Sequence, residues 1–496
     1  MTRFEREAGL LLPISALPSK YGIGCFSEEA YRFVDLLAYA GQSVWQLLPL
    51  CPTSFGDSPY QSPCSFGGNP YFISLEGLIE DGLLNYEEIS RDGWGERVDY
   101  AKLYRKRFPI LRLAYERFSS RQRPWDFGMF LAENCYWLED YAIFMAIKDK
   151  YSKPLWDLPQ LLRSRDADAL CDFRSSHAPE IDFYRFLQYE FFKQWKALRA
   201  YAASKNIKIM GDMPIYVSAD SSDVWANPEL FELDREERPL YVAGCPPDGF
   251  SPTGQLWGNT VYDWQEHKNT GFRWWGDRFR QALSMYDIVR IDHFRGFDAY
   301  YSIPFGAKDA TEGFWRGALG NELFSALGDL VSDERIIAED LGFMTDGVRK
   351  LLSDCGFSGM KILQFGFDGD VEHMPYSYPE RCVVYTGTHD NPTLMSWLSY
   401  LGSEEKKRLL EYLCVEGGDY KTLARRLISI AMQSRAELCV IPMQDHLYLG
   451  DEGRMNTPSS ETGNWTWRMS AQDMSEQVFD RIKEITRIGG RLRISS

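Results

Sequence analysis

The chain has 496 residues, which exceeds one ordinary domain of about 100–200 residues but falls short of a long modular array. Its 55 basic and 71 acidic side chains give a formal net charge of −16, and no Lys/Arg block occurs, so nucleic-acid and anionic-membrane surfaces are not expected. The 44% hydrophobic fraction excludes global disorder, and no apolar run approaches the roughly 20 residues of a membrane helix.

Eight short apolar runs, each ending abruptly at polar residues, predict eight β-strands. In chain order they cover residues 9–12, 43–48, 207–211, 288–291, 335–338, 360–364, 382–386 and 438–442. Helical patterns with recognisable ends lie between several of them, at residues 27–41, 346–355 and 420–434. Near-continuous apolar strands that alternate with helices are typical of a parallel sheet covered on both faces, and eight strands close a barrel. We therefore predict an α/β fold, a (β/α)8 TIM barrel.

The spacing of the strands is uneven, and the excess length falls at two places. Residues 51–206 separate the second and third strands and have mainly helical patterns, for instance at 129–148. Residues 213–286 separate the third and fourth strands and are rich in Pro, Gly and Trp. Both segments leave the carboxyl ends of strands, the face that carries activity in barrel enzymes. We predict one catalytic barrel over residues 1–496, with a mainly helical subdomain at 51–206 and a loop-rich subdomain at 213–286 that form the walls of a cleft.

Cysteine usage and the amino terminus favour a reducing compartment. Ten cysteines are scattered from Cys25 to Cys439 without a Cys-x-x-Cys pair, which argues against a zinc ribbon, a redox dithiol or a disulfide framework. The first residues carry charges where a signal peptide would begin its apolar stretch, so secretion is not expected. We expect reduced thiols and a cytoplasmic protein.

Four carboxylates, Asp212, Asp292, Glu339 and Asp390, each stand at the carboxyl end of a different predicted strand. One such residue alone is most simply a turn former or a helix cap, but in a closed barrel all four ends converge. Converging carboxylates indicate either a divalent cation or a general acid with a nucleophile. The chain has only six histidines and no His-x-His or His-Glu-x-x-His spacing, so we expect neither a metal nor another cofactor.

Histidine and arginine also gather at the predicted strand ends. His293, His389 and His446 follow the fourth, seventh and eighth strands. A buried histidine is often a satisfied core group, but clustering at one face favours hydrogen bonding to a ligand. Arg290 lies two residues before Asp292, on the same side of the strand. We expect its guanidinium to lower the pKa of Asp292 and keep it ionised, although a structural ion pair would have the same geometry.

Two loops combine Gly/Pro turns, neutral polar groups and an aromatic side chain. Residues 56–62 include Asp57 and Tyr60, and residues 249–259 include Gln255 and Trp257. Ring stacking together with many neutral hydrogen bonds suits a polyhydroxyl ligand, although packing would explain either loop alone.

Seven blocks of the sequence resemble the 4-α-glucanotransferases, the amylomaltase or disproportionating-enzyme family, which is related to the α-amylase group of barrel enzymes. The resemblance runs from about Leu10 to Arg468, and its blocks are residues 56–71, 211–217, 246–264, 290–297, 338–342, 387–391 and 463–468. The sequence departs from the family pattern at two places, and these departures concern loop shape and chain-length preference. Pro458-Ser459-Ser460 replaces the family's Pro-Gly-Thr, and Thr260 stands where a Pro is usual.

The resemblance implies a role for each strand-end group. Asp292 would be the nucleophile, Glu339 the general acid and base, and Asp390 the third carboxylate, which holds the sugar and stabilises the transition state. The subsite of the transferred glucose would be lined by Asp212, Arg290 and His389. Flanking sugars would contact Tyr60, Gln255, Trp257, Phe365 and Asn464.

Family chemistry moves a 1,4-α-glucan segment onto the 4-hydroxyl of an acceptor glucan or glucose with the configuration retained. Retention implies a covalent intermediate and a carboxyl separation of about 5–5.5 Å between Asp292 and Glu339. Maltooligosaccharides and other α-1,4-glucans are the expected partners, while the oligomeric state is left open. Two alternatives remain, an α-glucan hydrolase on the same barrel and a non-catalytic glucan-binding protein.

Overall fold

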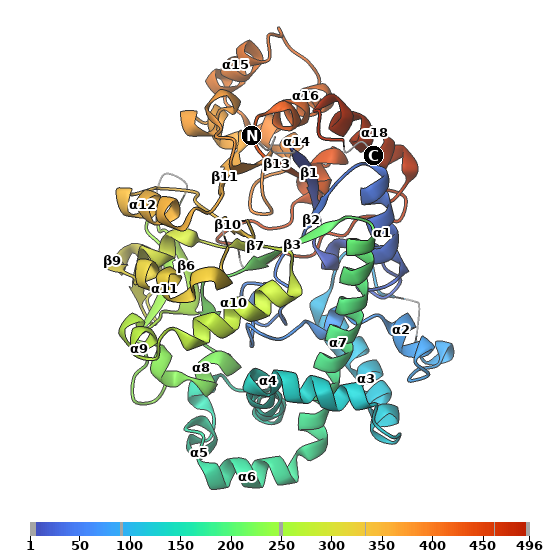
Figure 1. The fold of residues 1–496 in the computed structure, drawn as a ribbon, viewed down its shortest axis with the longest axis vertical. Coiled ribbons are helices and arrows are strands. Elements are labelled where there is room, and N and C mark those ends of the chain that lie inside the picture. Colours follow the sequence, from blue (N-terminus) through green and yellow to red (C-terminus); the bar gives the residue numbers. More distant parts are fainter. Residues whose placement is uncertain (1–5, 90–92, 248–250, 333, 461, 493–496) are drawn as a thin grey trace.

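Eight parallel strands form the central sheet of the computed structural model, which describes residues 6–89, 93–247, 251–332, 334–460 and 462–492. The strands are β1 (Glu7–Leu11), β2 (Val44–Gln46), β3 (Lys208–Met213), β7 (Ile288–Ile291), β10 (Ile336–Ala338), β11 (Gly359–Ile362), β12 (Cys382–Tyr385) and β13 (Leu438–Pro442). Their order in the sheet is β10-β7-β3-β2-β1-β13-β12-β11, and neighbouring strands run parallel (Figure 1).

A few contacts between β10 and β11 close this sheet into a barrel. Ile337 forms an isolated parallel bridge with Ser358, and the Ala338 N–H donates a hydrogen bond of 2.9 Å to the Ser358 carbonyl. The Asp340 carboxylate accepts a further hydrogen bond of 2.6 Å from the Met360 N–H, so a side chain supplements the backbone pairing here. The predicted (β/α)8 barrel is confirmed.

Apolar side chains fill the barrel and explain why its strands have near-continuous apolar sequences. Strands that are buried on both faces need apolar residues at every position, not only at alternate ones. The buried side chains that pack together inside the barrel are Leu11, Val44, Met210, Ile288, Ile337, Met360, Ile362, Val383, Tyr385, Leu438 and Val440.

Two strand boundaries differ from the prediction in ways that concern the site. β3 continues to Met213, so Asp212 lies inside the strand and pairs in register with Arg290 of β7. The sixth strand ends at Ile362, where the chain turns into helix α13 (Leu363–Phe367). Phe365 therefore stands on a helix at the mouth end of the strand.

Helices cover the outside of the barrel. They are α1 (Glu28–Tyr39), α7 (Ala178–Ser204), α10 (Arg273–Met285), α11 (Gly320–Leu327), α12 (Asp346–Cys355), α14 (Leu394–Tyr400), α15 (Ser403–Tyr412), α16 (Tyr420–Gln433) and α18 (Glu476–Ile488). The predicted bounds of α12 are confirmed, and α1 ends just before Gly41, whose φ of 69° suits a residue without Cβ.

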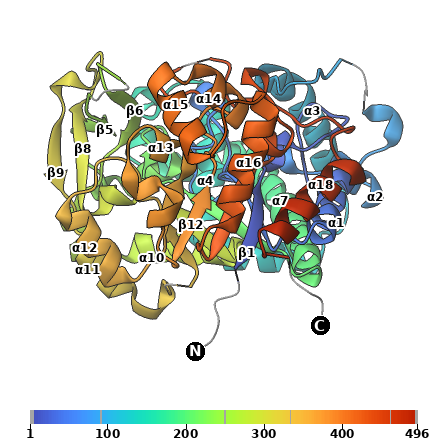
Figure 2. The same ribbon diagram turned by 90° about the horizontal axis from the view of Figure 1, so that it is seen from above.

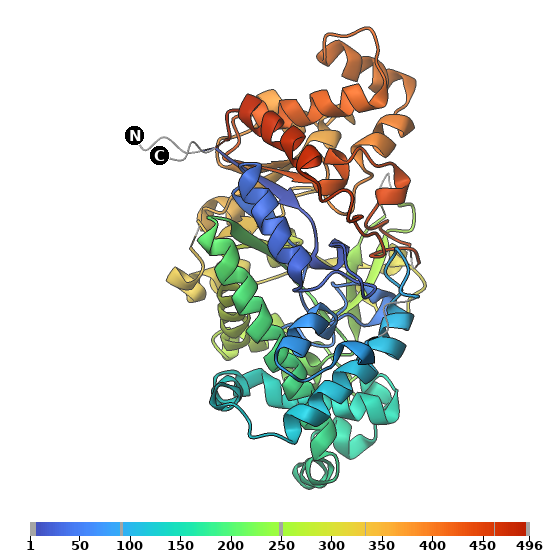
Figure 3. The same ribbon diagram turned by 90° about the vertical axis from the view of Figure 1, so that its right-hand side faces the viewer.

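The segment between β2 and β3 is mostly helical. Besides α7 it contains α2 (Leu75–Glu80), α3 (Tyr100–Ser119), α4 (Trp125–Tyr151), α5 (Gln160–Arg163) and α6 (Ala167–Ser176). In Figure 3 the blue-green helices of residues 100–176 lie at one end of the molecule, and the orange and red helices of residues 394–488 lie at the other.

A second, antiparallel sheet stands at the mouth of the barrel and had no predicted counterpart. Its strands are β4 (Val217–Ser218), β6 (Gln255–Thr260), β5 (Tyr241–Cys245), β8 (Ala299–Pro304) and β9 (Phe314–Gly317), in that spatial order. The short helices α8 (Ser222–Ala226) and α9 (Trp264–Asn269) lie in the same part of the chain, and α17 (Met443–His446) follows β13. Figure 2 shows this sheet on the side of the molecule opposite α1 and α18. The division of residues 1–496 into one barrel with subdomains at 51–206 and 213–286 stays a prediction.

Arg491 ties the two ends of the described chain together. Its buried guanidinium donates hydrogen bonds to the carbonyls of Glu7 at 2.7 Å, Met432 at 2.7 Å and Ala436 at 2.8 Å. Among the described residues, no helix combines the length and the apolar character needed to cross a bilayer.

We expect Arg491→Ala to lower the free energy of unfolding by about 3 kcal/mol, because several buried carbonyls would lose a charged donor. Urea denaturation checks this. Arg487→Ala is the matched control, since Arg487 is exposed and its ion pair among the described residues is with Glu484, and it should leave stability nearly unchanged. Equal effects of the two substitutions would contradict the proposed tie.

Candidate active site

One buried guanidinium gathers three of the four strand-end carboxylates. Nη1 of Arg290 donates to Asp212 Oδ1 at 2.7 Å and to Asp292 Oδ1 at 3.1 Å, while Nη2 donates to Glu339 Oε2 at 3.0 Å. The Arg290 side chain is only 3% exposed. The expected convergence of Asp212, Asp292 and Glu339 is confirmed, and Arg290 occupies the centre of the group.

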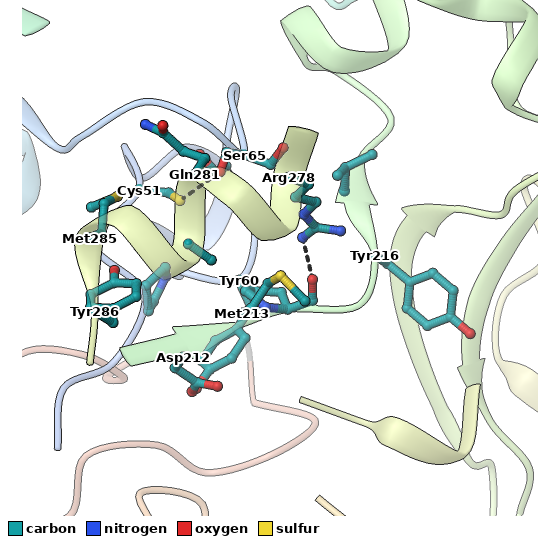
Figure 4. Close-up of a pocket in the computed structure, with 15 residues that line it drawn as sticks. Cys51, Tyr60, Ser65, Asp212, Met213, Tyr216, Arg278, Gln281, Met285 and Tyr286 are labelled. Carbon is teal, nitrogen blue, oxygen red and sulfur yellow. Dashed lines mark hydrogen bonds between the residues drawn. The ribbon is translucent and has the colours of Figure 1, made fainter. Parts of the chain in front are cut away.

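Asp212 lies beneath the other carboxylates and has no exposed side-chain surface. Its second oxygen, Oδ2, accepts a hydrogen bond of 2.6 Å from the Tyr60 hydroxyl. Figure 4 shows Asp212 and Tyr60 together on the wall of a narrow cavity of about 40 Å³, which Met213 and Tyr286 also line. Asp212 therefore holds Arg290 and Tyr60 in place rather than facing the open mouth.

Glu339 receives a second hydrogen bond from the turn that follows β7. His293 has a φ of 50°, in the left-handed region, and its N–H donates to Glu339 Oε2 at 2.7 Å. Backbone pairing continues beyond the strand ends, because the Glu339 N–H donates to the Ile291 carbonyl at 3.0 Å. Glu339 is thus fixed relative to Asp292 by backbone as well as by Arg290.

The pKa of Asp292 is shifted in the direction opposite to the expected one. Burial raises the pKa of Asp292 well above its ordinary value, although Arg290 acts to lower it, and the neighbouring charge of Glu339 raises it further. Burial opposes the charge of Glu339, but Arg290, the His293 N–H and a hydrogen bond from Asp292 together lower its pKa. Arg290 thus acts on Asp292 in the expected direction, but burial outweighs it.

Asp390 is the most exposed of the four carboxylates, with 44% of its side chain accessible. Asn456 Nδ2 donates to its Oδ1 at 2.6 Å, and Arg454 donates to its backbone carbonyl at 3.2 Å. His389 Nε2 lies 3.4 Å from the same Oδ1. Asp390 therefore faces the mouth on a segment that residues 454–456 support.

Hydrogen bonds join Asp212 to Tyr60 and Tyr60 to His389, whose Nε2 also lies 3.4 Å from Asp390 Oδ1. The rings of Tyr60 and His389 stack with centroids 5.4 Å apart, and the Tyr60 hydroxyl lies 2.9 Å from His389 Nε2. Burial and the Asp212 charge raise the pKa of Tyr60 well above its ordinary value, so its hydroxyl keeps the proton that it donates to Asp212. His389 Nε2 must then carry the hydrogen that it shares with Tyr60 and Asp390. Trp465 packs against both rings.

The two predicted ligand loops are tied to each other. Gln61 Nε2 donates to the Trp257 carbonyl and to Asn259 Oδ1, both at 2.7 Å. Trp257 donates to Gln255 Oε1 at 3.0 Å and meets the His293 ring edge-on, with centroids 4.8 Å apart. The structure thus brings Tyr60, Gln255 and Trp257 to the carboxylates, while Asp248, Gly249 and Phe250 of the second loop lie outside the described residues.

The predicted histidines divide into two kinds. His293 Nε2 is buried without a hydrogen-bond partner among the described residues, and burial lowers the pKa of its ring to about 4, so a neutral imidazole stands beside Glu339. His446 is buried in α17, where burial lowers its pKa to about 3. The described contacts of His446 include none with the carboxylates, so His293 and His389 are the histidines that the site brings together.

The remaining predicted residues lie at the periphery. Asp57 is exposed with a φ of 58°, and Phe365 is half-buried against His373. Asn464 closes the loop of residues 457–464, since its Oδ1 accepts from Thr457 N at 2.9 Å and its Nδ2 donates to Ser460 O at 2.8 Å.

The two departures from the family pattern are also visible in the backbone. Ser459 adopts a φ of 65°, a left-handed conformation that the family's Gly would adopt without strain. Thr260 lies in β6, and its buried hydroxyl has no partner among the described residues.

Asp445 is a functional candidate that the sequence reasoning missed. It is 1% exposed, and its carboxylate accepts hydrogen bonds from Thr386 Oγ1 at 2.5 Å and from the Leu394 N–H at 2.7 Å. These two donors flank the segment that carries His389 and Asp390. The sequence contained a signal for Asp445, because this residue follows an apolar strand just as Asp390 does. Among the described residues, no group of three or more acidic, His or Cys side chains is arranged to hold a metal.

Comparison with known proteins places the chain among glucan-transferring enzymes. A model of the 4-alpha-glucanotransferase family, glycoside hydrolase family 77, matches residues 12–474. The 4-alpha-glucanotransferase of Clostridium butyricum is 44% identical over 489 residues, which cover 96% of this chain and 99% of that protein. That of Thermus thermophilus is 43% identical over 499 residues, which cover 98% and 99%.

Solved structures agree. The amylomaltase from Streptococcus agalactiae in complex with acarbose superposes with a TM-score of 0.94 at 40% identity, covering 98% of this chain and 100% of that one. The amylomaltase from Corynebacterium glutamicum shares the fold, with a TM-score of 0.76 at 18% identity over 97% of this chain and 75% of that one.

We expect Asp445→Asn to change how stability depends on pH. Burial raises the pKa of Asp445 to about 6, above the roughly 3.9 of an unfolded aspartate, so folding takes up a proton between these values. Wild-type stability should therefore fall as pH rises from about 4 to about 6, a loss that the variant lacks. The unfolding free energy of wild type minus that of the variant should drop by about 2 kcal/mol between pH 4 and pH 7 in urea titrations.

Asp451→Asn serves as the control of opposite sign. A hydrogen bond from Tyr400 lowers the pKa of Asp451. The unfolding free energy of wild type minus that of Asp451→Asn should therefore rise with pH. A pH-independent difference for Asp445→Asn would contradict the buried, proton-binding carboxyl.

Proposed function

The chain belongs to the 4-alpha-glucanotransferase family, and we propose that Asp292, Glu339 and Asp390 perform its transfer of 1,4-α-glucan segments. The observation that supports this most directly is that one guanidinium, Arg290, donates hydrogen bonds to Asp292 at 3.1 Å and to Glu339 at 3.0 Å. Two carboxylates held side by side at a barrel mouth are the pair that a retaining reaction at a sugar requires.

The enzyme moves a segment of a 1,4-α-glucan onto an acceptor glucan or glucose. In the first step Asp292 attacks the anomeric carbon while Glu339 protonates the leaving glycosidic oxygen. A covalent glycosyl-enzyme forms. Glu339, now a carboxylate, then deprotonates the 4-hydroxyl of the acceptor, which attacks the same carbon from the other face and restores the α configuration. The carboxyl separation of about 5–5.5 Å stays a prediction.

This chemistry requires a proton on Glu339 and an ionised Asp292 when the sugar is bound. A hydrogen bond from Asp292 is among the interactions that lower the pKa of Glu339, while burial and the Glu339 charge raise the pKa of Asp292. We propose that a sugar bound between the two carboxyl groups interrupts this hydrogen bond, so that the proton resides on Glu339, next to the leaving oxygen.

Asp390 and its neighbours are suited to hold the sugar that reacts. Its exposed oxygens can accept hydroxyl hydrogens, and its charge lies near a site where positive charge develops. The full set of proposed sugar-binding residues is Asp57, Tyr60, Asp212, Gln255, Trp257, Arg290, His293, Phe365, His389 and Asn464. Of these, we assign Asp212 and Arg290 to hold other groups in place, because both side chains are buried.

Transfer prevails over hydrolysis when an acceptor reaches the intermediate before water does. Gln61 ties the Tyr60 loop to the Trp257 strand, which narrows the approach to the carboxylates. The tied Tyr60 loop and Trp257 strand favour a transferase over a plain hydrolase on the same barrel. The intact pair on Arg290 argues against a non-catalytic glucan-binding protein.

We also propose that the enzyme works in the cytoplasm on maltooligosaccharides and other α-1,4-glucans. The ten cysteines occur as thiols and not as disulfides, as is usual in a reducing compartment.

Incubation with maltotriose should give glucose together with a ladder of longer maltooligosaccharides. Asp292→Asn and Glu339→Gln should each reduce this transfer at least about a thousandfold, because one removes the nucleophile and the other the acid. Chromatography of the products measures both. Asp309→Asn alters a half-buried aspartate whose described hydrogen bonds are with Thr311 alone, and it should leave the ladder intact. Shorter sugars alone would indicate the hydrolase instead, and binding without any product would indicate the non-catalytic protein.

Trp257→Ala should raise the share of hydrolysis in the products about two- to tenfold, because an acceptor sugar would lose a stacking partner worth about 0.5–1.5 kcal/mol. The ratio of reducing-end release to glucose transfer measures this share. Trp125→Ala, which removes a 78% exposed indole on α4, should leave the ratio as it is in the wild type. An unchanged ratio in Trp257→Ala would refute the shielding role.

A further inference from the structure

Two large aromatic side chains near the proposed catalytic loops are exposed. Phe343 is 79% exposed and Trp315 is 42% exposed. Single exposed apolar residues are common on proteins and need no explanation. These two are unusual because one arginine, on the loop of the proposed nucleophile, contacts the ring of Trp315 and the backbone carbonyl of Phe343.

Arg295 connects three segments of the mouth. It belongs to the short 3-10 helix of residues 294–297 that directly follows Asp292 and His293. Its Nη1 donates to the Phe343 carbonyl at 2.7 Å, and its guanidinium carbon lies 3.9 Å from the centre of the Trp315 ring. Arg295 itself is only 8% exposed. One buried cation thus positions the loop after Glu339 against the edge strand β9.

The local backbone keeps Phe343 outside the core. Gly342 has a φ of 82°, and a Cβ there would meet nothing within 4 Å, so the loop stands clear of its surroundings. Trp315 pairs in register with Tyr301 on β8 and packs against that ring, while the guanidinium stacks on the indole. Arg295 therefore orders an aromatic surface and leaves a large part of it open.

We propose that Trp315, Arg295 and Phe343 form a binding platform for glucose units that lie beyond the sugars held at the carboxylates. The inference deepens the proposed function and rests on it. Phe343 follows Glu339 by four residues and Arg295 follows Asp292 by three, so the platform is continuous with the catalytic mouth. Aromatic rings stack on the apolar faces of sugar rings, and a neutral glucan needs no charged partner. Its ligand is a 1,4-α-glucan long enough to reach from the carboxylates to β9.

The exposed apolar side chains of α4 lack this continuity. Trp125, Met129 and Tyr136 form a stripe along α4, yet their described contacts include none with the catalytic loops. Figure 1 shows α4 and β9 in different parts of the molecule. Trp125 is accordingly a suitable control for the loss of an exposed indole.

The test compares a short and a long substrate in the full-length enzyme. The variants are Phe343→Ala, Trp315→Ala and the control Trp125→Ala, and the measurement is kcat/KM for disproportionation of maltotriose and of maltoheptaose. We expect both platform variants to lose about three- to tenfold on maltoheptaose and less than twofold on maltotriose. Trp125→Ala should match the wild type on both. Phe343→Tyr and Trp315→Phe, which keep a ring, should recover most of the activity on the long substrate.

Two results would overturn the platform. Equal losses on both substrates would mean that the residues only support the catalytic loops, and unchanged activity on maltoheptaose would mean that no sugar binds there. If the wild type made no ladder from maltotriose, the proposed function would fail separately. Calorimetric measurement of maltoheptaose binding would then test the platform. Phe343→Ala should weaken this binding about three- to tenfold relative to the wild type.

Discussion

The structure depends on one guanidinium that compensates three carboxylates at the mouth of a closed barrel. Burying a charge without a partner costs several kcal/mol, and three acidic groups brought together would repel each other as well. Arg290 resolves both problems because β3 and β7 pair in a register that sets it beside Asp212, while its other donors reach Asp292 and Glu339. The register of β3 and β7 and the acidity of the reacting pair therefore both depend on Arg290.

The same charge arrangement links the parts of the mouth that come from distant sequence. Asp212 fixes the Tyr60 hydroxyl, Tyr60 stacks on His389, and His389 reaches Asp390. The loop of Tyr60 is tied in turn to the strand that carries Trp257. Binding a sugar at one carboxylate thus acts on a preformed network, in which little side-chain freedom remains to be lost.

The barrel and most of its mouth could be predicted from the sequence, because Asp292 and Glu339 each end an apolar run and such ends converge in a barrel. The antiparallel sheet could not, since its strands are two to six residues long and β5 pairs with β8, across the intervening β7. The pKa direction of Asp292 also escaped prediction, because burial depends on loops that are remote in the chain. Asp445 was overlooked although it stands at a strand end, since its partners are backbone and hydroxyl groups that leave no sequence pattern.

The junction between β10 and β11 has fewer backbone pairs than the other strand junctions of the barrel. The other neighbouring strands share ladders of several residues, whereas this junction has one isolated bridge and one carboxylate, Asp340, that accepts the Met360 N–H. Local opening occurs where few backbone pairs must break. The seam lies immediately beside Glu339, so we expect local opening there to displace the proton donor before it disturbs the core. We therefore expect loss of catalytic competence to precede loss of the fold.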